Sequence, residues 1–437
     1  QTAWAMFDWA NSAYSLVIVS AIFPQVFTVF AEDNSVFFGI DFKNAETLYT
    51  VSICFSFLFI AIITPLLSGM SDYSGKKKRY MQFFTLLGSL SCMFLYYFSE
   101  ETLWIGVIGA ILASIGYSGS MVFYNSYLPD IAFEEQQDKV SAKGFSMGYI
   151  GSVTLLILNL AMVMKPEWFG FDIGTTEAEK NAASILAMRT SFITVGLWWV
   201  LFSQYSFYHL PKGIPTGNKV KRHVIFNGIK ELKIVWKSLT HNLRLKRFLN
   251  AFFVYSMAVQ TIMLVATYFG EQEINWGSES EKTMGLIVSI LIIQIVAVFG
   301  AILTSRSSAK FGNINTLIGI NMVWMSLCFY GYFVETPVQF YITASLVGFV
   351  MGGIQSLSRS TYSKFLPKTA DTTSYFSFFD VAEKIGIVIG MLIFGIIDQI
   401  TGSMRNSILF LFIFFLICNS VSLSAKISFL IFFGFHL

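Results

Sequence analysis

Charged residues are scarce in this sequence. Asp, Glu, Lys and Arg make up 13% of the 437 residues, about half of their usual share in soluble domains. Hydrophobic residues make up 55%, with 46 phenylalanines among them, and the mean hydropathy is +0.63. This composition excludes an ordinary soluble domain and indicates a polytopic membrane protein.

Cysteine and histidine are also few, and their positions exclude several kinds of chemistry. The four cysteines fall in apolar stretches, where a thiol behaves as a small hydrophobe rather than as half of a disulfide. The sequence GYSG at 116–119 matches a rhomboid-type serine protease motif, but such a serine needs a histidine base, and the four histidines lie within 209–247 and at 436. Neither a P-loop spacing nor a His/Glu metal motif is present. We therefore expect no enzyme, no metal and no cofactor.

Twelve apolar stretches are long enough to cross a bilayer as helices, which takes about 20 residues each. They cover residues 9–30, 47–68, 80–98, 102–125, 145–164, 188–208, 248–269, 284–305, 314–333, 338–358, 375–396 and 406–424. The sequence therefore predicts an all-α integral membrane protein with twelve spans.

Basic residues are unevenly distributed between the connecting segments. Those at 69–79, 126–144, 209–247, 306–312 and 359–373 hold 21 Lys and Arg, whereas the alternate segments hold five. The positive-inside rule places the first set in the cytoplasm together with both termini. The other set has no Asn-x-Ser/Thr acceptor, which favours a bacterial inner membrane over a glycosylated eukaryotic surface.

A repeat relates the two halves of the chain. Tyr124, Leu128 and Pro129 recur 238 positions later with the same residue types, and so does Gly148. Parallel six-span halves are the plan of the major facilitator transporters, whose substrate site lies between the halves. The expected domains are an N-terminal six-helix bundle (1–208), a cytoplasmic linker (209–247) and a C-terminal six-helix bundle (248–437).

The linker contains an amphipathic helical pattern. Apolar residues recur at steps of four and three, with basic residues between them: Ile225, Ile229, Leu232, Trp236, Leu239 and Leu243. Such a helix either lies on the anionic inner leaflet as a strap between the halves or packs on the bundle as a solvated linker. The first interpretation predicts anionic lipids as partners at the cytoplasmic face.

The first cytoplasmic loop, GMSDYSGKKKRY at 69–80, combines an acid, a glycine and a basic run. Gly75 allows a tight turn, Asp72 can cap backbone N–H groups or pair with a cation, and the run from Lys76 to Arg79 can anchor the loop to the anionic leaflet. The spacing resembles the loop between the second and third spans of the major facilitator superfamily, which in that superfamily holds the halves in the outward-facing state. Charge that only sets topology is the alternative.

The corresponding loop in the second half is SSAKFGNIN. It keeps the glycine as Gly312 but has Ala309 at the position of the acid. We therefore expect the first loop to be complete and the second to be degenerate.

Several motifs together resemble one narrower family. FDWANSAY, DYSGKKK, FYNSYLPDIA, GYIGS, GGIQSLSRS and SFFDVAEKIG are similar to the vacuole-effluxer family of the major facilitator superfamily, which includes fungal vacuolar amino-acid effluxers linked to autophagy and bacterial relatives. The resemblance extends from Trp4 to about Ile400. It implies a secondary transporter that moves a small polar organic solute, with amino acids favoured, by alternating access.

Four predicted spans each have a polar stripe on one helical face. Stripes of this kind either line a wet central cavity or form interhelical hydrogen bonds, which are worth about 0.6 kcal/mol per pair. The candidate substrate-pathway residues are Asn11, Ser15, Tyr117, Tyr124, Asn125, Ser256, Gln260 and Gln355.

Five charged residues lie in or beside the spans, where an ionised side chain costs at least about 2.5–3.5 kcal/mol. They are Asp8, Arg359, Asp380, Glu383 and Lys384. One hypothesis pairs Asp8 with Arg359 or Lys384 as a cytoplasmic gate. A second makes Asp8, Asp380 or Glu383 the proton carrier of a proton-coupled transporter, because burial favours the neutral form of a carboxyl group.

The main alternative to a transporter is a polytopic lipid-handling or receptor-like membrane protein. A cavity too apolar for a polar solute would favour that alternative. The partners expected from the transporter interpretation are a small-molecule substrate, protons and anionic lipids, with no nucleic acid.

Overall fold

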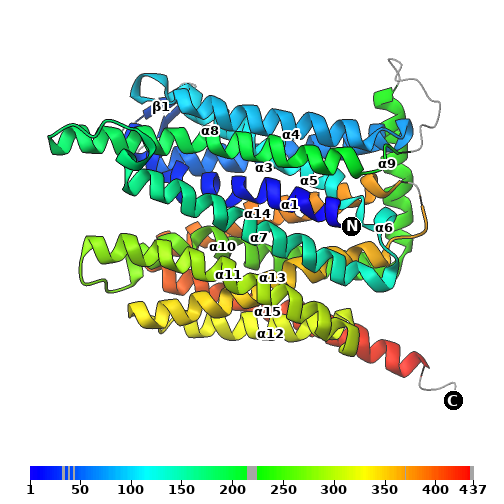
Figure 1. Cartoon of the computed structure of the whole chain (residues 1–437). Helices are drawn as coiled ribbons and strands as arrows, with labels where there is room; N and C mark the ends of the chain where they lie inside the picture. Colours follow the sequence, from blue (N-terminus) through cyan, green and yellow to red (C-terminus); the bar gives the residue numbers. More distant parts are fainter. Residues whose placement is uncertain (32–34, 38–39, 43–44, 214–223, 370, 434–437) are drawn as a thin grey trace. The chain divides into compact units, whose positions relative to one another are not determined.

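The structure, a computed structural model, is almost entirely helical (Figure 1). It describes residues 1–31, 35–37, 40–42, 45–213, 224–369 and 371–433. Within these ranges, nine helices are long and apolar enough to cross a membrane. The helices α4 (Lys77–Phe94), α14 (Thr372–Thr401) and α15 (Met404–Phe433) lie where the other three spans are predicted. The expected all-α membrane architecture is confirmed.

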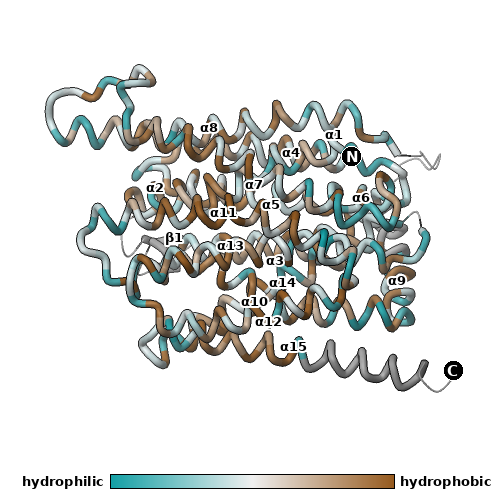
Figure 2. The backbone as a smooth tube through the Cα atoms, turned by 60° about the horizontal axis from the view of Figure 1, so that its bottom comes forward, coloured by the Kyte–Doolittle hydropathy of each residue, from teal (hydrophilic) through white to brown (hydrophobic). Residues whose placement is uncertain are grey.

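Hydropathy follows the individual helices (Figure 2). The middle of α11 (Glu279–Phe311) is hydrophobic, and hydrophilic residues gather in the loops. This distribution is required in a bilayer, where a helix satisfies its own backbone hydrogen bonds and exposes apolar side chains.

The chain forms two compact units. Unit 1 comprises Gln1–Tyr127, Met147–Leu232 and Ala370–Ser377, and unit 2 comprises Leu128–Ser146, Lys233–Thr369 and Phe378–Leu437. Three helices contribute residues to both units: α7 (Glu134–Met164), α9 (Val224–His241) and α14. The start of α7 thus packs in unit 2 and the start of α14 packs in unit 1, an exchange that the sequence did not predict. The domain boundaries at 208 and 248 stay a prediction.

The remaining helices of unit 1 are α1 (Thr2–Ala13), the π-helix η1 (Tyr14–Ile22), α2 (Phe23–Phe30), α3 (Ala45–Ser74), α4, α5 (Leu103–Asn125) and α8 (Glu177–His209). Unit 1 also contains the antiparallel strands β1 (Ser35–Phe37) and β2 (Ile40–Phe42). Three short 3-10 helices lie in its connections: η2 (Leu95–Tyr97), η3 (Glu100–Thr102) and η4 (Pro166–Phe169). Unit 2 further contains α6 (Leu128–Ile131), α10 (Leu243–Glu273), α11, α12 (Asn313–Gly331), α13 (Pro337–Phe365) and α15.

The first span is not a regular helix. Its middle, Tyr14–Ile22, is π-helical and ends where α2 begins with Pro24 in its first turn. Proline lacks an N–H and its ring collides with the carbonyl four residues earlier, so the backbone before it cannot close α-helical hydrogen bonds. The Ser20 hydroxyl donates to the Ser15 carbonyl at 3.0 Å, five residues back. π-Helical segments of this kind are frequent at functional sites.

Unit 2 is organised around a close packing of α11 on α13. A Cβ on Gly352 would collide with the backbone of Ala297, and one on Gly300 would collide with the backbone of Phe349. Small residues of this kind let membrane helices approach closely enough to gain dispersion contacts without a hydrophobic driving force. The side chains that face the rest of unit 2 are therefore held on a rigid pair.

Candidate functional site

Asp8 is buried in unit 1 and is held by α5. The Tyr124 hydroxyl donates to Asp8 Oδ2 at 2.7 Å, and Asp8 is 3% exposed. Tyr124 is itself fixed by Trp4. The Trp4 indole N–H donates to the Tyr124 carbonyl at 2.9 Å, and the two rings stack with their centroids 4.4 Å apart. A charged residue in a spanning helix is tolerated here because an oriented hydroxyl meets it.

The other predicted pathway residues of unit 1 divide into two groups. Asn11 is fully buried, with its amide 2.9 Å from the Met121 sulfur. Ser15, Tyr117 and Asn125 are only half-buried. The stripe of the first span therefore has a buried and a half-buried member, and the half-buried residues of both spans are the better candidates for contact with a solute.

Residues 69–80, predicted as a loop, contain the last turn of α3, which caps the first turn of α14. Asp72 Oδ2 accepts a hydrogen bond of 2.7 Å from the Ser374 backbone N–H, one of the four amides that a helix leaves unpaired at its start. A carboxylate at this end is also favoured by the helix dipole. Gly75 turns the chain with φ of +65°.

The basic run of this loop is used unevenly. Lys77 Nζ donates to the Thr372 hydroxyl at 3.3 Å and to the Ser126 carbonyl at 3.2 Å. Lys76 is half-buried and Arg79 is exposed. Of the predicted run from Lys76 to Arg79, Lys77 makes the contacts to the start of α14 and to the end of α5.

A second acidic cap, in unit 2, was missed from the sequence. Asp138, at the start of α7, accepts hydrogen bonds of 2.9 Å from the Ser308 hydroxyl and from the Asn313 amide, and forms a 2.7 Å ion pair with Lys364. Ser308 and Asn313 both belong to the SSAKFGNIN stretch in which Ala309 stands at the position of the expected acid. The second loop therefore does meet an acid, which α7 supplies. No spacing rule could have located it, because Asp138 lies 170 positions from Ser308.

Arg359 of α13 is buried against the same part of α7. Its Nε donates to the Ser141 hydroxyl and its Nη2 to the Ser141 carbonyl, both at 2.9 Å, and its guanidinium lies 4.1 Å from the centre of the Phe145 ring. Asp8 lies in unit 1 and Arg359 and Lys384 lie in unit 2. The Asp8 gate pairing therefore stays a prediction.

The acids of α14 form a buried charged cluster in unit 2. Lys384 Nζ lies 3.3 Å from Glu383 Oε2 and 3.8 Å from Asp380 Oδ1, and the Gln260 amide donates to Glu383 Oε1 at 2.9 Å. Asp380 is 6% exposed, and its Oδ2 has no hydrogen-bond partner among the described residues. With both carboxyl groups ionised the cluster would have one negative charge more than positive, which is costly in an apolar bundle.

The last predicted pathway residues lie in the same unit as this cluster. Ser256, which is buried, and the half-buried Gln260 lie on α10, and the half-buried Gln355 lies on α13. The Tyr255 and Ser358 hydroxyls, 2.6 Å apart, connect the two helices. These residues give unit 2 a polar side built from α10, α13 and α14.

Solved structures identify the class of the fold. The chain is similar to the major facilitator superfamily transporter FucP in the outward conformation, with a TM-score of 0.70 and 13% identity over 96% of each chain. It is also similar to the proton:xylose symporter XylE, with a TM-score of 0.67 and 13% identity over 96% of this chain and 92% of that one. The fold is that of major facilitator transporters.

The family follows from the sequence comparisons. The chain belongs to the vacuole effluxer Atg22-like family, whose model matches residues 1–427. It is 30% identical to an uncharacterized MFS-type transporter, YxiO of Bacillus subtilis, over 95% of this chain and 92% of that protein. It is 24% identical to autophagy-related protein 22 of Kluyveromyces lactis over 86% of this chain and 78% of that protein. The resemblance inferred from the motifs is confirmed, and the family is one of transporters rather than enzymes.

The Asp138–Lys364 pair predicts a non-additive response to mutation. Asp138→Asn and Lys364→Met should each destabilise the purified protein by about 1–3 kcal/mol, because each leaves a largely buried partner group without its counter-charge. The double variant should lose less than the sum of the two. Unfolding in mixed detergent measures this, and strictly additive losses would show that the pair contributes no coupling.

Proposed function

We propose that this secondary transporter moves a small polar organic solute across the membrane by alternating access, with amino acids as the favoured class and a proton as the coupling ion. The transporter class is established by family and fold. The substrate class is supported by the family alone. XylE, which has the same fold, is a proton:xylose symporter, and this supports proton coupling as part of the proposal.

The observation on which the proposal chiefly rests is the Asp380–Glu383–Lys384 cluster. Two carboxyl groups share one ammonium group, and Asp380 Oδ2 is unpartnered within the described part of the chain. A proton on Asp380 would make the cluster neutral, and a proton lost from it would restore a buried charge. The cluster can therefore make a conformational equilibrium depend on proton binding.

We further propose that the two acidic caps hold one state of the cycle. Asp72 caps the first turn of α14 in unit 1, and Asp138 ties the first turns of α7 to α11, α12 and α13 in unit 2. Each cap holds the start of a helix whose remainder belongs to the other unit. Release of the two caps would free the first turns of α7 and α14 to move together with the rest of each helix.

The membrane setting proposed is a bacterial inner membrane with both termini in the cytoplasm and anionic lipids at that face. The α9 helix supports the lipid contact, since Val235 and Leu239 are buried while Ile234 and Trp236 are exposed beside Lys233 and Lys237. Exposed apolar and basic side chains on one helix suit the interface of an anionic leaflet. Ile225 and Leu232 lie outside the side chains that the structure describes.

The transport function is tested by counterflow in proteoliposomes. Vesicles loaded with one unlabelled solute at a time, from amino acids, peptides and sugars, should accumulate the labelled form of at least one, and amino acids are expected first. Accumulation needs no ion gradient, so it tests transport separately from coupling. Uptake no higher than in protein-free vesicles for every solute, together with thermal stabilisation of the protein by lipid alone, would favour the lipid-handling alternative.

Proton coupling is tested at Asp380. Asp380→Asn keeps the shape but cannot exchange a proton, so solute addition should no longer change the lumenal pH while counterflow continues. Asp398→Asn on the same helix, half-buried and outside the cluster, is the matched control and should keep the pH response. Persistent solute-driven pH change in Asp380→Asn would remove Asp380 as the proton carrier.

A further inference from the structure

The four residues that follow α8, 210–213, are bound to the rest of unit 1, and we call them the linker start. Lys78, in the first turn of α4, donates from Nζ to the Leu210 carbonyl at 2.9 Å. The Tyr127 hydroxyl, two residues after the end of α5, donates to the Pro211 carbonyl at 3.0 Å. Two consecutive backbone carbonyls are therefore held by side chains from two other elements, which fixes the path of the chain as it leaves α8.

Both donors are withdrawn from solvent. Lys78 is 9% exposed and Tyr127 is fully buried. Burying an ammonium group or a phenol hydroxyl is costly unless a hydrogen bond replaces the lost water. Each carbonyl of the linker start supplies such a bond, so departure of the linker start would take an acceptor from each donor.

The linker start also touches the turn between α3 and α4 through its backbone. Gly213 has φ of +84°, and a Cβ at this position would collide with the Gly75 carbonyl oxygen. Glycine is the residue that accepts both the positive φ and the close approach. The linker start thus lies directly on the turn that Gly75 makes.

Two contacts connect the linker start to the Asp72 cap. Lys77 Nζ lies 4.4 Å from the centre of the Tyr127 ring and also donates to the Thr372 hydroxyl in the first turn of α14. The Gly75 N–H donates to the Asp72 carbonyl at 3.2 Å, so the turn under the linker start is continuous with the capping acid. All of these residues belong to unit 1.

We propose that the linker start is a latch on the Asp72 cap. While residues 210–213 are docked, they hold the Gly75 turn and the side chain of Lys77 where these support the capped first turn of α14, and undocking of the linker start weakens the cap. The linker therefore controls the cap and does not serve only as a tether. The consequence for transport rests on the proposed role of the cap in holding one state of the cycle.

The strength of the cap can be measured at the backbone N–H of Ser374. This amide is one of the first four of α14, which have no partner within the helix, and Asp72 is its acceptor. Hydrogen exchange at Ser374, followed by mass spectrometry with fragmentation of the peptide, therefore reports the cap without any transport measurement.

The first test removes the two donors to the linker start. The double variant Lys78→Met and Tyr127→Phe keeps the size of both side chains and leaves a ring beside Lys77, and it should speed exchange at Ser374 several-fold. Tyr208→Phe, an exposed tyrosine near the end of α8, is the matched control and should leave the rate unchanged. An unchanged rate in the double variant would overturn the proposal.

The second test separates action through the cap from a general loosening of unit 1. In an Asp72→Ala background the cap is already absent, so the double variant should add no further acceleration at Ser374. Acceleration by the same factor with and without Asp72 would contradict the latch. Faster exchange at Ser374 with unaltered transport would confirm the latch and count instead against the proposed role of the cap.

Discussion

Every charge taken into a membrane-spanning bundle must find a partner, and this requirement determines much of the structure. Asp8 meets the Tyr124 hydroxyl, Asp72 meets the first turn of α14, Asp138 meets three donors, and Arg359 meets both oxygens of Ser141. Bilayer hydrocarbon offers no solvation, so each of these contacts replaces water that the group would otherwise keep. Most of them join elements that are distant in sequence.

The exception is the cluster on α14. There the acids outnumber the ammonium group, and the Asp380 oxygen without a partner marks an imbalance that tight packing alone does not explain. A natural protein tolerates an unsatisfied buried group where function requires it. Binding of the proposed proton removes the excess negative charge in one state of the cycle, and release of the proton restores that charge in another.

The spans and the charges within them could be predicted because both depend on local sequence alone. A span is a long apolar run, and an acid within such a run is easily recognised. The partners could not be predicted, because Asp8 and Tyr124 are 116 positions apart and Asp72 and Ser374 are 302 apart. The expected degeneracy of the second loop shows the limit most clearly. Ala309 correctly indicated a missing acid, but only the packing of α7 in unit 2 shows Asp138 in its place.

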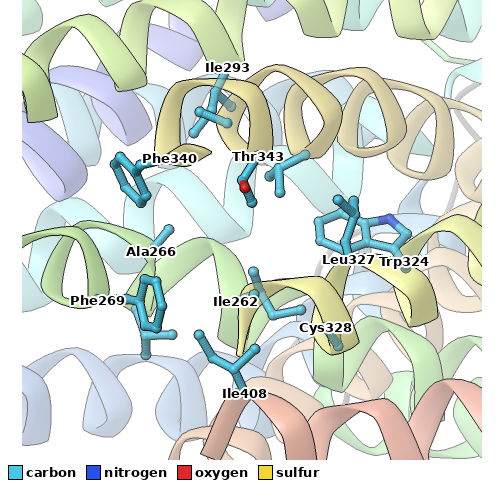
Figure 3. Close-up of a pocket in the computed structure, with 14 residues that line it drawn as sticks. Ile262, Ala266, Phe269, Ile293, Trp324, Leu327, Cys328, Phe340, Thr343 and Ile408 are labelled. Atoms are coloured by element: carbon cyan, nitrogen blue, oxygen red, sulfur yellow. The ribbon is translucent and has the colours of Figure 1, made fainter. Parts of the chain in front are cut away.

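The exchanged helix starts could not be predicted either. Hydropathy marks α7 and α14 as single spans, and nothing in their periodicity indicates that the first turns of each pack in a different unit from the rest. The same holds for a small apolar pocket in unit 2 (Figure 3), since Ala266, Cys328 and Ala344, which line it, are ordinary residues until α10, α12 and α13 bring them together.

The central claim is that the cap of Asp72 on α14 holds one state of the transport cycle. It is tested most directly by the alkylation rate of a cysteine at Asn125, a half-buried position at the end of α5, in a chain without native cysteines. Asp72→Ala removes the acceptor for the Ser374 N–H and should raise that rate several-fold, whereas Glu135→Gln, an exposed acid at the start of α7, should not. An unchanged rate in Asp72→Ala would contradict the account.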